Sequence, residues 1–151
     1  MEKIKFGRRV GTTIYHTGMV ARALSSQTFV EKGFDLTPEQ FLILDLVQEK
    51  GELYQRQICE ITLKDRSNVA RLIKILEEKS LIQREQSSNG RRIYKITATE
   101  KGKEVRDAIK PTALEVRHLL MNGITQEDLK ITLATLNKVY ENARPLVKLQ
   151  I

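Results

Sequence analysis

Cysteine, tryptophan and long apolar runs are scarce or missing in this chain of 151 residues, and each scarcity excludes a class of protein. The single cysteine, Cys59, cannot form an intrachain disulfide, which argues against a disulfide-stapled secreted domain. No apolar run reaches about 18 residues, so the sequence predicts no membrane-spanning helix and no membrane partner. Residues 1–9 are mixed and charged, unlike a signal peptide, and we therefore expect a cytoplasmic protein.

Motifs for catalysis and for metal or cofactor binding are also missing. The sequence has no glycine-rich phosphate loop and no nucleophile elbow. His16 and His118 are far apart and belong to no cluster of metal-ligating residues. The acidic pairs Glu77-Glu78 and Glu127-Asp128 occupy adjacent helix positions, which point to different sides and cannot form an acid–base pair. We expect no enzymatic activity, no cofactor and no metal site.

An amphipathic helix is predicted over residues 66–79. Asp65 and the short polar residues that follow it can accept hydrogen bonds from the free N–H groups of a first turn. One apolar stripe, with the spacing i, i+3, i+4, i+7, consists of Val69, Leu72, Ile73 and Leu76. The candidate DNA-binding residues of this helix are Arg66, Ser67, Asn68, Arg71 and Lys74. Such side chains can reach base edges or phosphates from a major groove, although an ordinary solvated helix face is the alternative.

The elements predicted around this helix complete the pattern of a winged helix-turn-helix. A shorter helix, from Gln55 to about Thr62, precedes it across a tight connection at residues 63–65. Two segments with strand character, residues 81–86 and 92–97, follow it. Asn89-Gly90 between them is a strong hairpin signal, because both residues tolerate positive φ. Asn89, Arg91 and Arg92 are therefore candidates for contacts with phosphate or the minor groove, unless they only solubilise a hairpin edge.

Positive charge is concentrated on this part of the chain. The whole sequence has 26 Lys and Arg against 19 Asp and Glu, a net charge of +7. Residues 64–95 hold nine basic and four acidic side chains, a net charge of +5, whereas residues 1–63 are balanced. Because affinity for a polyanion grows with the number of phosphates that are neutralised, this clustering favours double-stranded DNA as a partner.

These residues resemble the MarR-type transcriptional regulators over nearly the whole chain. The segment Leu36–Leu44 is similar to that family's "LTxxQfxvL" pattern, and Ile58-Cys59 stands where the family usually has Leu-Ala. Three further segments are Ser67–Ile73, similar to "STVTRLV", Leu76–Ile82, similar to "LExKGLI", and Ile96–Gly102, similar to "LTxxG". Each segment is a weak signal, but the ordered set at this spacing is specific.

Two positions depart from the family pattern. The family often has an Asp-x-Arg pair in the wing, whereas residues 88–92 of this chain contain no acid, which leaves the register of the wing arginine open. Ser80 replaces the usual glycine after the helix predicted over residues 66–79, which corresponds to the family's recognition helix. Because serine adopts the left-handed conformation less readily than glycine, we expect that turn to differ.

The resemblance implies a single domain over residues 1–151 that is mainly α-helical with a small β-hairpin wing. Residues 36–100 would form the winged helix-turn-helix, flanked by dimerisation helices in residues 1–35 and 101–151. The implied function is a transcriptional regulator, expected to be a homodimeric repressor released by a small-molecule effector, and its two-fold symmetry predicts a pseudo-palindromic operator. A winged-helix module that binds protein without DNA is the alternative, and it would have an apolar or acidic recognition face.

Amphipathic stripes at both ends of the chain support the dimer. The predicted N-terminal helix, roughly Phe6 to Lys32, has an apolar stripe from Val10 to Thr28 and includes three glycines that indicate either close helix approach or poor local order. A helix from Thr99 to about Met121 is interrupted by Pro111, which predicts a kink. The last helix begins after Thr125, and its apolar stripe is Leu129, Leu133, Leu136, Tyr140, Ala143 and Val147. Such a stripe packs either on a second copy, which we favour, or on the chain's own core.

The candidate effector site lies on the N-terminal helix. Tyr15, His16, Met19 and Arg22 are candidates for lining a cavity against the winged module, although ordinary surface or core positions explain them as well. The resemblance implies effectors that are small and often aromatic or anionic. Cys59 is interpreted as a buried small residue and not as a redox switch, because reactivity requires exposure and a nearby cation.

Overall fold

The chain folds as a mainly helical protein with one small sheet. The structure, a computed structural model, describes residues 2–86 and 94–148, with side chains from residue 7 onward. Its elements are α1 (Glu2–Glu31), α2 (Pro38–Lys50), β1 (Leu53–Tyr54), α3 (Gln55–Thr62), α4 (Arg66–Glu78), β2 (Ile82–Gln86), β3 (Tyr94–Ala98), α5 (Glu100–Leu120), α6 (Gln126–Ala143) and the 3₁₀ turn η1 (Arg144–Leu146). The predicted fold class is confirmed, and α1 begins four residues earlier than predicted.

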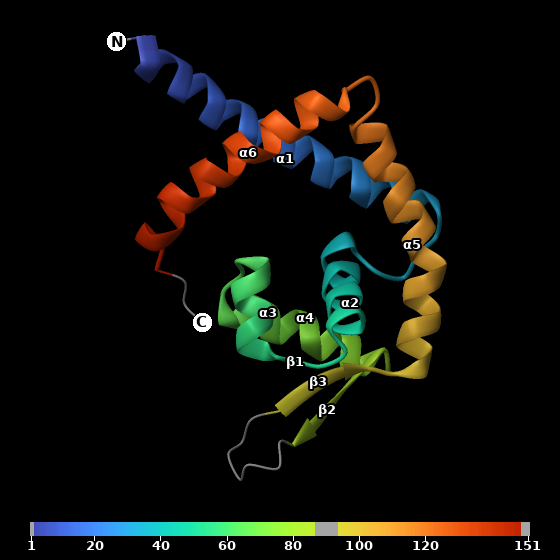
Figure 1. Cartoon of the computed structure of the whole chain (residues 1–151). Helices are drawn as coiled ribbons and strands as arrows, with labels where there is room; N and C mark the ends of the chain where they lie inside the picture. Colours follow the sequence, from blue (N-terminus) through green and yellow to red (C-terminus); the bar gives the residue numbers. More distant parts are fainter. Residues whose placement is uncertain (1, 87–93, 149–151) are drawn as a thin grey trace.

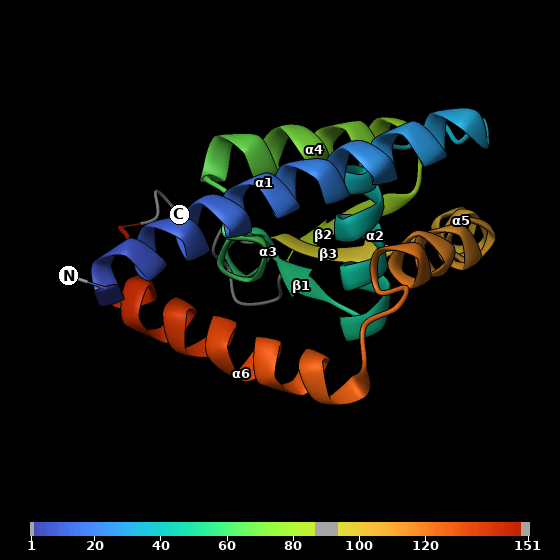
Figure 2. The same ribbon diagram turned by 90° about the horizontal axis from the view of Figure 1, so that it is seen from above.

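The helices of the winged module lie between its own hairpin and the terminal helices. Strands β2 and β3 lie at one end of the molecule, α1 and α6 lie at the other, and α5 connects the two ends along one side (Figure 1). Seen from above, α4 and α6 lie on opposite sides of the view, with the sheet between them (Figure 2). The sheet has the antiparallel order β1-β3-β2. The short strand β1 was not predicted, because two residues carry no alternation pattern.

Most of the hydrophobic core lies in the winged module, and Phe29 of α1 and Ile109 of α5 join it. The apolar stripe predicted for α4 is buried, with exposed fractions between 0 and 2%. It packs against α2 and α3, where Ile43, Leu44 and Ile58 are fully buried. Helix α2 was not predicted as a helix, although its start has a sequence signal. Thr37 and Gln40 form a capping box around a proline at the first helical position.

Three hydrogen bonds join the end of α4 to the start of α5. The Nζ of Lys101 donates to the carbonyl of Lys79 (2.9 Å), and Thr99 donates its hydroxyl to the carbonyl of Ser80 (2.7 Å). The backbone N–H of Thr99 donates to the carbonyl of Leu81 (3.1 Å). We call these contacts the α4–α5 clasp. The carbonyls of three consecutive residues, Lys79 to Leu81, are thereby satisfied where the chain leaves α4.

The turn at Ser80 corrects one expectation. Ser80 has a φ of 59°, the left-handed conformation that glycine would adopt, so the serine does not change the form of the turn. The backbone N–H of Leu81 closes the helix end by donating to the carbonyl of Leu76 (2.9 Å). A non-glycine residue in this conformation costs about 1 kcal/mol, and the hydrogen bonds of the clasp to the neighbouring carbonyls offset that cost.

The terminal helices are only partly covered by the chain itself. Ile109 and Val116 of α5 are buried, and the helix changes direction part-way along its length (Figures 1 and 2), in keeping with the kink predicted at Pro111. Thr125 caps α6 as predicted. No residue of α6 is buried, which contradicts the alternative that its stripe packs on the chain's own core.

The glycines of α1 do not mark a close approach within the chain. A Cβ added at Gly7, Gly11 or Gly18 would meet no described atom within 4 Å beyond the neighbouring residues and backbone of its own helix. Intrachain packing therefore does not explain them, and they stand on a helix whose N-terminal half is exposed. Among the described residues, no helix has the length and apolar character that crossing a membrane requires.

Candidate nucleic-acid interface

The α3–α4 turn sets where the recognition helix begins. Leu63 ends α3 in the left-handed conformation, with a φ of 54°. Two residues later, the carboxylate of Asp65 caps α4 by accepting a hydrogen bond from the backbone N–H of Asn68 (2.8 Å). The side chain of Gln55 donates to the carbonyl of Arg66 (3.3 Å), so the start of α3 also holds the start of α4. The predicted N-cap is confirmed, and the first turn of α4 is fixed from two directions.

The face of α4 opposite its buried stripe is polar and exposed. Arg66, Ser67, Arg71 and Lys74 are exposed and Asn68 is half-buried, so the structure brings these five predicted residues onto one surface. The Nη2 of Arg71 donates to the Oδ1 of Asn68 (3.3 Å), which holds the guanidinium along the helix. Lys74 lies 3.8 Å from Glu78, an exposed pair that contributes little to stability. Such a surface offers charged and amide donors to a groove.

The base of the wing is tied to the recognition helix. Strands β2 and β3 pair from Ile82 with Ala98 to Gln86 with Tyr94. The guanidinium of Arg84 on β2 lies 2.6 Å from the carboxylate of Glu77 on α4. The direction of the hairpin is therefore linked to that of α4. The candidate residues Asn89, Arg91 and Arg92 lie outside the described residues.

A carboxylate on α2 connects three elements beside this surface. The Oε1 of Glu39 is 2.8 Å from Nη2 of Arg22 on α1 and 3.0 Å from Nζ of Lys64 in the α3–α4 turn. The hydrogen bond from Lys64 lowers the pKa of Glu39 below its ordinary value; burial opposes this shift, and the charges of Lys64, Arg22 and Arg71 add to it. Sequence reasoning missed Glu39, because its partners are 17 and 25 positions away and no local pattern links them.

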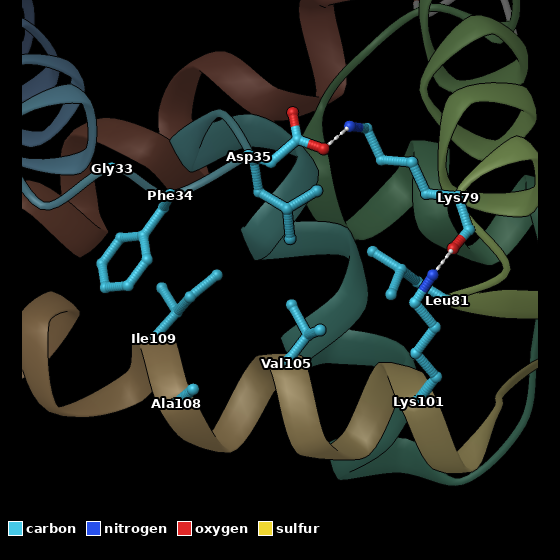
Figure 3. Close-up of a pocket in the computed structure, with 10 residues that line it drawn as sticks. Gly33, Phe34, Asp35, Lys79, Leu81, Lys101, Val105, Ala108 and Ile109 are labelled. Atoms are coloured by element: carbon cyan, nitrogen blue, oxygen red, sulfur yellow. Dashed lines mark hydrogen bonds and ion pairs between the residues drawn. The ribbon is translucent and has the colours of Figure 1, made fainter.

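A hollow of about 320 Å³ lies where the α1–α2 loop, the end of α4 and α5 meet (Figure 3). Its apolar lining comes from Phe34, Leu36, Leu81, Val105, Ala108 and Ile109. Three charged side chains stand at its border: Lys79 forms an ion pair with Asp35, and Lys101 reaches the carbonyl of Lys79. An apolar floor with ammonium groups at its border suits a small amphipathic anion.

The residues predicted for an effector site lie elsewhere. Tyr15, His16 and Met19 are exposed on α1, and the rings of Tyr15 and His16 are 5.7 Å apart. Arg22, 70% exposed, points to Glu39. None of the four lines the hollow of Figure 3, and their role in ligand binding stays a prediction.

Two further expectations concern chemistry at single residues. Cys59 is buried, and burial raises the pKa of its thiol, which keeps it in the unreactive protonated form. The interpretation of Cys59 as a small core residue thus agrees with its surroundings. In the described parts of the chain, no three His, Cys, Asp or Glu side chains gather in a way that could hold a metal ion.

Known proteins share this architecture. A family model described as MarR family matches residues 34–93. The uncharacterised HTH-type transcriptional regulator YybA of Bacillus subtilis (strain 168) is 34% identical over 83% of this chain and 84% of its own length. The crystal structure of the transcriptional regulator SlyA has a TM-score of 0.78 at 32% identity, over 87% of this chain and 93% of that one. A MarR mutant from E. coli complexed with operator DNA also has a TM-score of 0.78 and the same coverage, and its 17% identity supports the fold alone.

Proposed function

The chain belongs to the MarR family of winged-helix, DNA-binding transcriptional regulators, which are not enzymes, and we propose that it is a homodimeric repressor of a pseudo-palindromic operator. The observation that carries this proposal is the exposed polar face of α4, with Arg66, Ser67, Asn68, Arg71 and Lys74 on one surface. In a two-fold dimer, each protomer would place α4 in a major groove, with half-sites about one helical turn (~34 Å) apart. A repressor acts where the DNA is, so we also propose a cytoplasmic location.

Replacing Arg71 by alanine should separate base reading from phosphate contact. We expect specific binding to weaken by about 1–3 kcal/mol and sequence preference to relax, because Arg71 stands in the middle of the exposed face. Arg91→Ala, alone or with Arg92→Ala, should weaken cognate and random duplexes more evenly and lower the salt slope by about one for each lost phosphate contact. Titration of an operator selected from genomic fragments, against a scrambled duplex at several salt concentrations, measures both quantities.

Arg117→Ala is the matched control, since it removes one exposed arginine in the last turn of α5. It should leave the specificity ratio unchanged. A wing variant that abolishes specificity while Arg71→Ala preserves it would reverse the two roles. Binding to random duplex that does not respond to salt would favour the alternative, a protein-interaction module.

We propose that the repressor is released by a small amphipathic anion bound in the hollow of Figure 3. The apolar floor would take the body of the ligand, and its carboxylate would pair with Lys79 and Lys101 in competition with Asp35. Lys79 directly follows α4, so a ligand that changes its contacts alters how the recognition helix is held on α5. A site at Tyr15, His16, Met19 and Arg22 is the second possibility, because those side chains are exposed and a second protomer could supply the opposite wall.

Filling the hollow should abolish the effector response. Millimolar benzoate or naphthoate should raise the apparent Kd for the operator, and the uncharged amides should not. Ala108→Phe should remove this response without changing DNA affinity in the absence of ligand, because Ala108 lines the hollow and belongs to α5, not to the polar face of α4. Tyr15→Ala serves as the comparison. If it removes the response and Ala108→Phe does not, the site on α1 is the correct one.

A further inference from the structure

One carboxylate lies between the helix assigned to dimerisation and the helix assigned to DNA reading. Glu39 is in the first turn of α2, and its Oε1 contacts both Arg22 of α1 and Lys64 of the α3–α4 turn. The side chains of Glu39 and Lys64 are only 24% and 20% exposed. Because partly buried charges are screened less than surface charges, this pair should hold its geometry better than the exposed pairs of the molecule.

Lys64 lies in the turn that determines where α4 begins. It follows Leu63, whose left-handed conformation ends α3, and it precedes Asp65, which caps α4. Because Glu39 on α2 holds the Lys64 ammonium, the α3–α4 turn is fixed relative to α2. Arg66, Ser67 and Asn68 follow within one helical turn, so a shift of this turn moves all of them relative to a groove.

We propose that Glu39 is a positioning residue for DNA recognition, tying α1 to the α3–α4 turn and so fixing the direction in which α4 presents its N-terminal face. This inference rests on the proposed function. It adds that the position of α1 influences the orientation of the recognition helix α4. In this scheme Arg22 orients the carboxylate of Glu39, and that carboxylate in turn holds Lys64. None of the three needs to contact a base.

Electrostatics alone predicts the opposite effect, which makes the proposal testable. Glu39 is a negative charge within the influence of Arg71, a predicted DNA contact. Its removal raises the net charge of the protein by one, and this change alone should strengthen binding to a polyanion. A positioning role predicts weaker binding instead, and predicts it for the cognate sequence only.

Glu39→Gln in the full-length protein distinguishes the two. We expect the Kd for the selected operator to rise about three- to tenfold, the effect of losing a partly shielded ion pair, while the Kd for a scrambled duplex stays the same or falls. Glu49→Gln is the matched control, since it makes the same charge change at an exposed position of α2. It should not weaken operator binding.

A double-mutant cycle tests the role of Arg22. Arg22→Ala should weaken operator binding in the wild-type background and add nothing in the Glu39→Gln background, because its effect passes through the carboxylate. Lys64→Arg, which keeps the cation, should bind the operator like the wild type. Lys64→Gln should weaken operator binding as Glu39→Gln does, but because it lowers the net charge by one it should not strengthen binding to the scrambled duplex.

Two results would overturn the proposal. The first is Glu39→Gln binding the operator as tightly as the wild type or more tightly. The second is a parallel loss of operator and random binding with a lowered melting temperature, which would show a purely structural role. Failure of the wild type to bind any selected DNA would refute the proposed function itself, and is therefore a separate outcome.

Discussion

Replacing Gly102 by alanine should destabilise the protein by about 3 kcal/mol or more, the upper range for overpacking. A Cβ at this position would lie 2.0 Å from the carbonyl oxygen of Leu81 and 2.9 Å from its carbonyl carbon. Both are backbone atoms held in the α4–α5 clasp, so neither can yield without separating α5 from α4. The added Cβ would also lie 3.3 Å from Cδ1 of Leu44 on α2, a tight contact on another side.

Thermal unfolding measures this effect. A loss of about 3 kcal/mol lowers the melting temperature of a protein of this size by roughly 6–12 °C. Gly18→Ala is the matched control, since a Cβ there meets no described atom within 4 Å and the residue lies inside α1. Alanine at Gly18 should instead stabilise α1 by about 0.5–1 kcal/mol. Equal melting temperatures for Gly102→Ala and the wild type would show that the start of α5 can move freely.

Charging the apolar face of α6 should dissociate the proposed dimer and abolish specific DNA binding with it. Leu133 and Leu136 are 60% and 38% exposed, and Tyr140 on the same stripe is 48% exposed. No residue of α6 is buried within the chain, so lysines at positions 133 and 136 leave the fold of the protomer intact. In a dimer the remaining exposed surface of the two leucines would contribute about 1.5–3 kcal/mol together through burial, and two lysines buried in their place would add a desolvation cost of several kcal/mol. The double variant should therefore raise the dimer dissociation constant at least about 100-fold.

Sedimentation equilibrium at micromolar concentration tests the assembly, and operator titration tests its consequence. Ala134→Lys with Asn142→Lys adds the same two charges on the opposite side of α6 and should preserve the dimer. Truncation before Gly123 removes the whole helix and should match the charged variant. A wild-type chain that sediments as a monomer would refute the dimer, and a charged variant that remains dimeric would place the interface elsewhere.

Local patterns in the sequence predicted the elements that depend on local chemistry. The periodic stripe of residues 69–76 and the cap at Asp65 located α4, because burial and capping follow directly from spacing. The turn at Ser80 shows the limit of that approach. Residue preference alone indicated a different turn, and the hydrogen bond from Thr99, 19 positions away, holds the left-handed serine instead.

Contacts between distant residues could not be predicted in the same way. Glu39 acquires its partners only when α1, α2 and the α3–α4 turn meet, and the hollow beside Lys79 and Lys101 is formed by three separate segments. The predicted cavity on α1 used residues on one helix, Tyr15 to Arg22, because a sequence shows which residues share a helix face and not which segments face each other. Gly102 was noted only as part of a motif, and its close approach to Leu81 became visible with the packing of α5.

The α4–α5 clasp also bears on how the wing can evolve. Its three hydrogen bonds close the chain between residues 79–81 and 99–101, so the β2–β3 hairpin is anchored at its base, where Ile82 and Ile96 are also buried in the core. Insertions or deletions at the tip of such a hairpin leave the recognition helix and α5 where they are, and doubling a loop's length costs only about 0.6 kcal/mol. The wing can therefore change length and sequence, and with them the DNA contacts it makes, without a compensating change elsewhere in the chain. The same geometry constrains Thr99 and Lys101, whose side chains donate two of the three bonds, more than residues 79–81, which contribute backbone carbonyls only.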